Sequence, residues 1–505
     1  MENTRDTIAA ISTAVSESGI GIIRISGQCA IEAADLLFCS PGGKTRLKEV
    51  KSHTIHYGFI CDPEGHVIDE VLVSVMHAPR TYTAENTVEI NCHGGVLAMQ
   101  KVLDAVLHCD RYQKTGKGQE AGERARESDE TVHVRAAAPG EFTKRAYLNG
   151  RIDLSRAEAV MDLIEAKNEF ALRNSVSQVR GSLFRVIAEL RGKILYQIAH
   201  IEASLDDPEN LDFTPHLPEF REDLSAWRNT LKRLILTAED GRLAAEGIRT
   251  VIVGKPNAGK SSFLNLLLGQ ERAIVTEIAG TTRDLLTETI HLQGMTLLVT
   301  DTAGIRDTDD TVEKIGVERA RQSVEEADLL LWMVDSSVPL DENDRSIAAL
   351  LSGRRSIILL NKTDLAEQTG VEDVRKMVQD NVVRSASVMK KSKDTEPESL
   401  TQIIPFSAKE GTGYDAFVRM LKDLFFHGKL SWNDEVVITN ARHKLLLEQA
   451  EDSLERVSDS LDAGMSEDFF SIDLMSAYES LGAIIGEEVG EDLADEIFSR
   501  FCMGK

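Results

Sequence analysis

Residues 248–269 of this 505-residue chain read IRTVIVGKPNAGKSSFLNLLLG, and this stretch decides the fold of the middle of the chain. It joins an apolar run typical of a buried strand, a glycine-containing loop and the start of a helix. The loop has the spacing GxxxxGKS over residues 254–261. In that arrangement the loop amides and the positive end of the helix bind phosphate groups. The residues predicted to surround the phosphates are Asn257, Ala258, Gly259, Lys260, Ser261 and Ser262.

Lys260 and Ser261 have separate predicted roles in this loop. Lys260 would reach the β- and γ-phosphates as a point charge, and the hydroxyl of Ser261 would coordinate Mg²⁺. A lone match to this pattern can arise by chance, so the prediction depends on motifs further along the chain.

Two such motifs fit a site that responds to a γ-phosphate. GTTRD, residues 280–284, places Thr282 where its hydroxyl can reach Mg²⁺ and its amide the phosphate. DTAG, residues 301–304, follows the strand-like MTLLVT, so Asp301 can hold Mg²⁺ through water and Gly304 can move its amide. Taken alone, either motif could be an ordinary loop or a strand-end turn. Their order favours a nucleotide switch.

The base is predicted from NKTD, residues 361–364, which follows the apolar run SIILL. A carboxylate at Asp364 can accept two hydrogen bonds from guanine, whereas adenine would leave it unpaired. PFSAKEG, residues 405–411, adds an amide for the guanine carbonyl and a serine that braces the loop. The sequence therefore predicts GTP on an open, mostly parallel sheet. The predicted base contacts are Asn361, Lys362, Asp364, Ser407 and Ala408.

The composition limits the possible partners. Lys and Arg number 57 against 83 Asp and Glu, so the formal net charge of -26 disfavours direct binding to nucleic acid or an anionic membrane. No signal peptide is evident, and no apolar run approaches the roughly 18 residues of a membrane span. The six cysteines form no CxxC pair. We expect a soluble, cytoplasmic protein.

The length predicts several domains. Residues 1–140 alternate β-like runs with one helix, VLAMQKVLDAVL, and indicate an α+β domain. Helical patterns over 141–246 and 429–505 flank the predicted GTPase domain at 247–428, which indicates an all-α domain with the GTPase domain inserted in it. Ser155 and Glu158 suggest a capping box before a long helix over 183–205, and Leu445, Leu446 and Leu454 suggest another helix. The charged stretch 111–133 is predicted to be a mobile loop.

Several longer segments carry a resemblance to a known family. They are GIGIIRISG, EINCHGG, APGEFTKRAYLNGRIDLSRAEA, the GTPase motifs and the terminal FCMGK. Together they resemble the tRNA modification GTPase family MnmE, also called TrmE, over nearly the whole chain. In small GTPases a Gln after DTAG orients the attacking water, but Ile305 stands here. The resemblance implies that Glu313 takes this catalytic role, although from its acidic surroundings alone Glu313 could be a solvated charge.

The resemblance also implies that K⁺ stabilises the transition-state charge. From the residues alone, Asn257 could be only a turn former. Three of the implied K⁺ ligands, Asn257, Thr276 and Thr281, would also contact GTP. The implied K⁺ ligands are Asn257, Thr276, Ile278 and Thr281.

For the N-terminal domain the resemblance implies dimerisation and binding of a 5-formyl or 5,10-methylene tetrahydrofolate. The implied folate-binding residues are Arg24, Glu89, Arg151 and Lys505, with Arg151 standing where the family carries Lys. Without the resemblance, Arg24 would read as a paired structural residue and Lys505 as a free chain end. Cys502 is implied for the modification chemistry, or it is a small apolar side chain that docks the tail.

The resemblance finally implies a partner protein. This is a flavoprotein of the MnmG or GidA type, which would carry FAD, form a heterotetramer or larger complex with the homodimer, and supply most of the tRNA contacts. Together they would add a carboxymethylaminomethyl or aminomethyl group to the wobble uridine of certain tRNAs. The alternative is an RNA- or ribosome-binding assembly GTPase, which would need a basic module that the sequence does not display.

Overall fold

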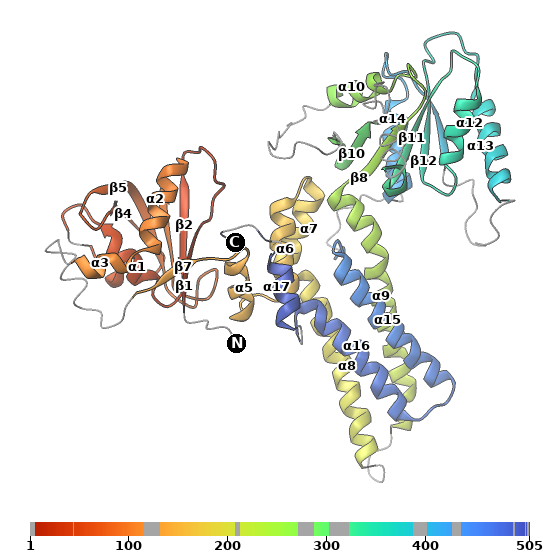
Figure 1. Cartoon of the computed structure of the whole chain (residues 1–505). Coiled ribbons are helices and arrows are strands. Elements are labelled where there is room, and N and C mark those ends of the chain that lie inside the picture. The colour runs from red at the N-terminus through yellow and green to blue at the C-terminus, as the bar shows by residue number, and fades with distance from the viewer. Residues whose placement is uncertain are drawn as a thin grey trace, which may run out of the picture. The chain divides into compact units, whose positions relative to one another are not determined.

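The chain folds into two compact units (Figure 1). The computed structural model describes residues 6–43, 45–115, 132–207, 213–270, 287–301, 323–386, 401–426, 436–487, 490–499, 501 and 504. Unit 1 comprises residues 1–161, 178–215 and 459–505, and unit 2 comprises residues 162–177 and 216–458. The predicted helical domain contributes to both units, and the predicted domain limits stay a prediction.

Unit 2 contains the predicted open sheet. Its strand order is β13-β12-β11-β8-β10-β9, and every neighbouring pair is parallel except β9 with β10. Most strands read as apolar runs because helices cover both faces of the sheet. The strands are β8 (Ile248–Val253), β9 (Thr287–Leu292), β10 (Met295–Asp301), β11 (Leu329–Asp335), β12 (Ser356–Asn361) and β13 (Thr401–Pro405).

Within the described ranges, helices cover both faces of this sheet. On one face lie α10 (Lys260–Gln270) and α14 (Tyr414–Phe426), where the Phe263 ring packs edge-on against Phe406 and Phe417 at 5.4 Å. On the other lie α12 (Glu342–Leu350) and α13 (Val371–Ala386), around the fully buried Trp332. The predicted mostly parallel α/β domain is therefore confirmed.

Unit 2 also contains a pair of long helices that pack against each other. The helix α9 (Leu217–Glu246) leads through Gly247 into β8, and Arg228 on it pairs with Glu451 of α15 (Ala441–Asp462) at 2.9 Å. The predicted helix around 445–461 is confirmed, but its buried face differs from the prediction. Leu445 is exposed because the packed face of α15 is formed by His443, Leu447, Ala450, Leu454 and Val457.

The N-terminal part of unit 1 is a mostly antiparallel sheet of order β3-β4-β5-β6-β2-β1-β7. Its core lies between the sheet and two helices, α1 (Ala30–Leu37) and α2 (Val96–Leu107), the second being the predicted VLAMQKVLDAVL helix. The strands are β1 (Thr7–Ile11), β2 (Gly21–Ser26), β3 (Phe38–Cys39), β4 (Thr54–Cys61), β5 (Val67–Met76), β6 (Thr87–Cys92) and β7 (Val134–Ala136). The predicted α+β class is confirmed.

Further helices follow the N-terminal sheet, and side chains connect pairs of them. Arg191 of α8 lies over the Tyr478 ring of α16 at 3.9 Å, and Lys144 of α5 pairs with Asp495 of α17 at 2.5 Å. These helices are α5 (Glu141–Leu148), α6 (Leu154–Glu165), α7 (Glu169–Val179), α8 (Ser182–Asp206), α16 (Glu467–Ile485) and α17 (Glu491–Ser499). Within the described part of the chain, no helix combines the length and apolar character that crossing a membrane requires.

Two local predictions were wrong. Ser155 does not begin a capping box, because Asp153 precedes α6 and its carboxylate accepts the Arg156 amide at 3.1 Å. The loop predicted over 111–133 begins later, because residues up to 115 belong to the helix α3 (Asp110–Thr115). There Tyr112 is buried and its hydroxyl donates to the Cys61 carbonyl at 2.8 Å. Residues 116–131 lie outside the described ranges.

Candidate functional site

The phosphate-binding loop lies between β8 and α10, where the sequence predicted it. Gly254 has a φ of 155°, and a Cβ there would lie 2.6 Å from the Met333 carbonyl oxygen. Gly259 has a φ of 103°, and its Cβ would lie 2.1 Å from the Asn361 side-chain nitrogen. Both positions therefore require glycine. Asn257 is exposed and left-handed, with a φ of 62°, which fits the turn-forming role and leaves the K⁺ role a prediction.

The predicted phosphate ligands open α10. The Lys260 ammonium turns back over the loop and donates to the carbonyl oxygens of Gly254 at 2.7 Å and Lys255 at 2.9 Å. Ser261 and Ser262 follow in the first turn, where the unpaired amides of a helix N-terminus bind anions. These two hydrogen bonds hold the Lys260 ammonium over the loop.

The structure describes two of the three predicted Mg²⁺ ligands, Ser261 and Asp301. Asp301 ends β10 and pairs in register with Ile252 of β8, so its backbone reaches the end of the sheet that carries the loop. The oxygen donors of Ser261 and Asp301 are of the hard type that Mg²⁺ prefers. The remaining switch and K⁺ residues lie outside the described ranges; they are Thr276, Ile278, Thr281, Thr282, Gly304 and the predicted catalytic Glu313.

Asn361 joins the phosphate loop to the base loops. It ends β12, is 2% exposed, and donates from its side chain to the Ala258 carbonyl at 2.8 Å. Its side-chain oxygen accepts the Ala408 amide at 2.9 Å. One side chain therefore connects residues 258, 361 and 408 through both ends of its amide, which explains why an Asn is needed here.

The predicted guanine contacts lie next to this bridge. The Ser407 hydroxyl donates to one carboxylate oxygen of Asp364 at 2.8 Å, and the Thr363 hydroxyl donates to the Phe406 carbonyl at 2.9 Å. Lys362, between Asn361 and Thr363 in the sequence, has a left-handed backbone with a φ of 67°. The structure thus brings all five predicted base residues together, with the Asp364 carboxylate already oriented.

Sequence reasoning missed three acids, one at the end of β11 and two at the start of α12, that bind lysines of these loops. Asp335 accepts from Lys362 at 2.5 Å, and although burial opposes ionisation, the hydrogen bonds from Lys362 and Ser337 lower the pKa of Asp335. Asp344 and Asp341 accept from Lys255 at 2.6 and 3.1 Å. The signal in the sequence was VDSSVPLDEND, an acid at a strand end followed by an Asp-x-x-Asp helix start.

Two of the predicted folate residues, Arg24 and Arg151, lie beside an aromatic ring, Tyr82, that sequence reasoning also missed. Arg24 and Glu89 are register partners on β2 and β6, with a hydrogen bond of 2.9 Å. The guanidinium groups of Arg24 and Arg151 lie 5.4 and 5.0 Å from the centre of the Tyr82 ring. The Gly504 carbonyl accepts from Arg24 at 3.4 Å, so the chain end reaches the same place.

The other predicted residues of the chain end, Cys502 and Lys505, lie outside the described ranges. His93, in the CHGG segment, is exposed and hydrogen-bonds to Asp69 through its Nδ1 at 2.7 Å. That bond raises the pKa of His93. The pair is a surface ion pair, and no predicted ligand residue contacts it in the described part of the chain.

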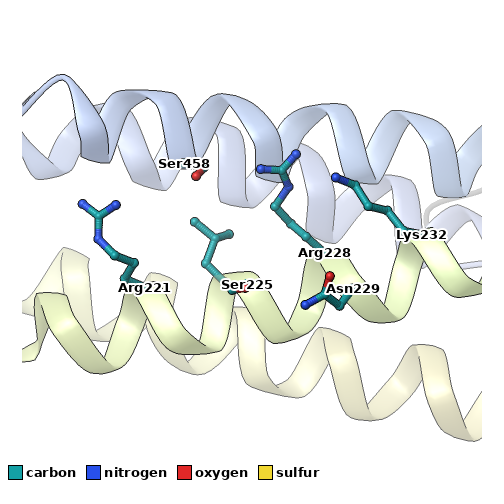
Figure 2. A pocket seen from close by; sticks show the side chains of 7 residues that line it. Arg221, Ser225, Arg228, Asn229, Lys232 and Ser458 are labelled. Atoms are coloured by element: carbon teal, nitrogen blue, oxygen red, sulfur yellow. The ribbon is translucent and has the colours of Figure 1, made fainter.

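A separate hollow of about 300 Å³ lies along α9 and α15. Figure 2 shows Arg221, Arg228 and Lys232 extending from one helix, with Ser458 on the facing helix. Two of these cations already pair with an acid, because Glu451 lies 2.9 Å from Arg228 and 3.3 Å from Lys232. The hollow is therefore a poor anion site, and none of the predicted site residues lines it.

The geometry places the chain in the class of P-loop GTPases, since a phosphate loop, an Asn-Lys-x-Asp loop and a Ser-Ala-Lys loop meet at one end of a parallel sheet. The model of the GTP-binding protein TrmE N-terminus matches residues 7–151, and that of the MnmE helical domain matches residues 154–502. The chain belongs to the MnmE (TrmE) family.

Full-length relatives agree with the family models. The chain is 47% identical to a protein of Lachnoclostridium phytofermentans and 44% identical to one of Geobacillus kaustophilus, each over 99% of both chains. Both relatives are named tRNA modification GTPase MnmE. Among solved structures, the FeoB G-domain from Methanococcus jannaschii is similar at 19% identity with a TM-score of 0.24, covering 35% of this chain and 97% of that one. The family assignment rests on the models and the full-length relatives.

Proposed function

We propose that this chain is a GTP hydrolase that acts in tRNA modification. Relatives with that name share 40–47% identity over nearly their whole length. The observation that carries the proposal is the Asn361 bridge, which joins the phosphate loop at Ala258 to the base loop at Ala408 by bonds of 2.8 and 2.9 Å. A site preorganised for both ends of GTP needs little rearrangement to bind it.

Each described group has a definite task in this proposal. Lys260 neutralises β- and γ-phosphate charge, and the amides at the start of α10 donate to phosphate oxygens. Asp364 accepts from guanine while Ser407 holds its carboxylate in place. Ser261, Thr282 and Asp301 would hold Mg²⁺, which neutralises charge that develops on the phosphates.

Hydrolysis itself needs a group that positions water, since Ile305 has no polar side chain. We assign this role to Glu313, whose carboxylate can accept a hydrogen bond from water. The K⁺ proposed at Asn257, Thr276, Ile278 and Thr281 would supply the positive charge that an arginine finger provides elsewhere. The oxygen donors of these residues suit an alkali cation.

The N-terminal part of unit 1 is proposed to bind a one-carbon tetrahydrofolate. Two guanidinium groups held over the Tyr82 ring suit an anionic ligand, because such cations can pair with carboxylates. Arg24, Glu89, Arg151 and Lys505 would orient it. Cys502 lies near the same chain end in sequence and is the proposed group for modification chemistry.

The modification is proposed to occur in a complex with an FAD-carrying partner of the MnmG or GidA type. The formal net charge of -26 favours a division of labour, in which the partner supplies most of the tRNA contacts and a homodimer of this chain supplies GTP and folate. The target would be the wobble uridine.

The test is reconstitution. Purified chain should hydrolyse GTP and not ATP, faster in K⁺ than in Na⁺, and together with its flavoprotein partner it should convert the wobble uridine of tRNA to an aminomethyl-type nucleoside. GTP hydrolysis without any change in tRNA nucleosides would overturn the modification role and favour a binding switch.

A further inference from the structure

Lys255 has two connections that run in opposite directions. Its backbone carbonyl accepts from the Lys260 ammonium at 2.9 Å and from the Ala258 amide at 3.2 Å, inside the phosphate loop. Its own ammonium donates to Asp344 at 2.6 Å and Asp341 at 3.1 Å, at the start of α12. A displacement of the Lys255 side chain would therefore also move the Lys255 carbonyl, which accepts from the Lys260 ammonium.

The two carboxylates that accept from Lys255 are fixed by hydrogen bonds of their own. Asp344 is 1% exposed and accepts the Asp341 amide at 3.0 Å, while Asp341 accepts the amides of Asn343 and Asp344 at 2.9 and 3.1 Å. This reciprocal capping box fixes both carboxylates on the first turn of α12. The anchor for Lys255 is thus a preformed pair of acids, in which Asp344 is buried and Asp341 lies at the surface.

The lysine is charged in this position. Burial alone would lower its pKa, but the hydrogen bonds to Asp344 and then Asp341 raise the pKa of Lys255 above its usual value. Because a buried carboxylate without its partner is costly, Asp344 in turn retains the lysine. The raised pKa of Lys255 keeps its ammonium charged at neutral pH, where it can pair with the two carboxylates.

We propose that Lys255 is a positioning residue of the nucleotide site, which acts through Lys260. The ion pair with Asp344 and Asp341 fixes the Lys255 carbonyl, and that carbonyl holds the Lys260 ammonium where the β- and γ-phosphates bind. The inference rests on the proposed GTP site and extends it to a residue that does not contact the nucleotide through its side chain.

A merely structural ion pair would also lower stability when broken, so the test separates stability from binding. Lys255→Met keeps the aliphatic stem and removes the charge, and Lys255→Met combined with Asp344→Asn also removes the unpaired carboxylate. In the full-length chain the single variant should melt at a lower temperature, and the double variant should regain most of that loss. GDP affinity and the KM for GTP should worsen roughly 10-fold in both, as expected for a misplaced phosphate ligand.

Two further variants serve as controls. Lys255→Arg keeps the charge and should remain within about 3-fold of the wild type in KM, because the guanidinium can still pair with the two carboxylates. Arg249→Met removes a different ion pair of the same unit, between Arg249 and Asp328 at 3.0 Å, and should leave GDP affinity and KM unchanged.

The outcomes are distinct. Wild-type affinity and KM in Lys255→Met, alongside a lower melting temperature, would overturn the positioning role. If Lys255→Met fails to fold, the double variant Asp341→Asn with Asp344→Asn decides, because the amide oxygens can still cap the helix while both charges that hold Lys255 are lost; unchanged KM there also overturns the proposal. Failure of the proposed GTP function would appear in the wild type itself, as no binding of GDP and no hydrolysis of GTP.

Discussion

The nucleotide site of unit 2 and the proposed folate site of unit 1 are built by different means. At the nucleotide site, the predicted residues that the structure describes lie in short motifs at or just after the ends of strands, and Asn361 connects the phosphate loop to the base loop directly. At the folate site, Arg24, Tyr82, Arg151 and Gly504 come from four distant parts of the sequence. The first arrangement is local and preorganised, whereas the second depends on strand register and on where the chain end docks.

Loss of Glu313 tests the chemistry of the local site and should have the largest effect. Glu313→Ala should lower turnover by about several hundred-fold with nucleotide binding nearly intact, since water positioning acts mainly in the transition state. Single-turnover hydrolysis and GDP binding by equilibrium titration measure the two parts. A matching loss of affinity would indicate structural damage.

Asp364 tests base selection at the same site. Asp364→Asn replaces one acceptor oxygen by a donor facing guanine, so GTP affinity should fall by roughly 100-fold. Competition with a fluorescent guanine nucleotide measures the loss. Ser407→Ala, which removes only the 2.8 Å brace, is the matched control and should cost much less. Equal losses in both variants would mean that orientation and not the carboxylate itself decides the affinity.

Deleting the last five residues, FCMGK, tests the dispersed site. The Gly504 carbonyl is bound by Ser12 at 3.0 Å and by Arg24 at 3.4 Å, so the deletion should remove this docking and Lys505 together. Folate affinity by calorimetry should fall roughly 10-fold or more, and tRNA modification should be lost. GTP hydrolysis should remain, and Tyr82→Ala should reproduce the folate defect with the tail intact. Unchanged folate affinity would show that the tail acts elsewhere.

The same contrast explains what the sequence could predict. The phosphate and base loops were predictable because strand-end motifs of parallel strands must meet at one edge of the sheet. Tyr82 was not, because nothing near it in sequence indicates that Arg24 and Arg151 flank its ring. The acids at 335, 341 and 344 were missed because carboxylates in a charged loop usually face solvent. Asp153 was not predicted as the N-cap of α6 because Ser155 and Glu158 have the Ser-x-x-Glu spacing of a capping box.

The smallest effect on chemistry is expected at Glu141, which stabilises the start of α5 just before Arg151. Its carboxylate accepts from Arg135 at 2.6 and 2.8 Å, from the Ala138 amide at 2.8 Å and from Arg145 at 3.0 Å. Burial opposes ionisation, but these bonds, with Arg135 foremost, lower the pKa of Glu141 from 4.5 to about 2. That lowering corresponds to about 3 kcal/mol of stability.

The sign of the pH dependence follows from the lowered pKa. The stabilising contribution is complete above pH 4.5, the unfolded value, and disappears as the pH falls toward about 2. Glu141→Gln should therefore lower the melting temperature clearly at pH 7 and progressively less below pH 4.5. Hydrogen exchange of residues 134–148 should rise at pH 7 while that of residues 248–270 stays unchanged, and GTP turnover should match the wild type. Equal destabilisation at pH 7 and pH 3 would mean that lost packing, and not the charge of Glu141, explains the effect. The proposed folate site of unit 1 would then depend less on the ion pairs of Glu141 than its geometry indicates.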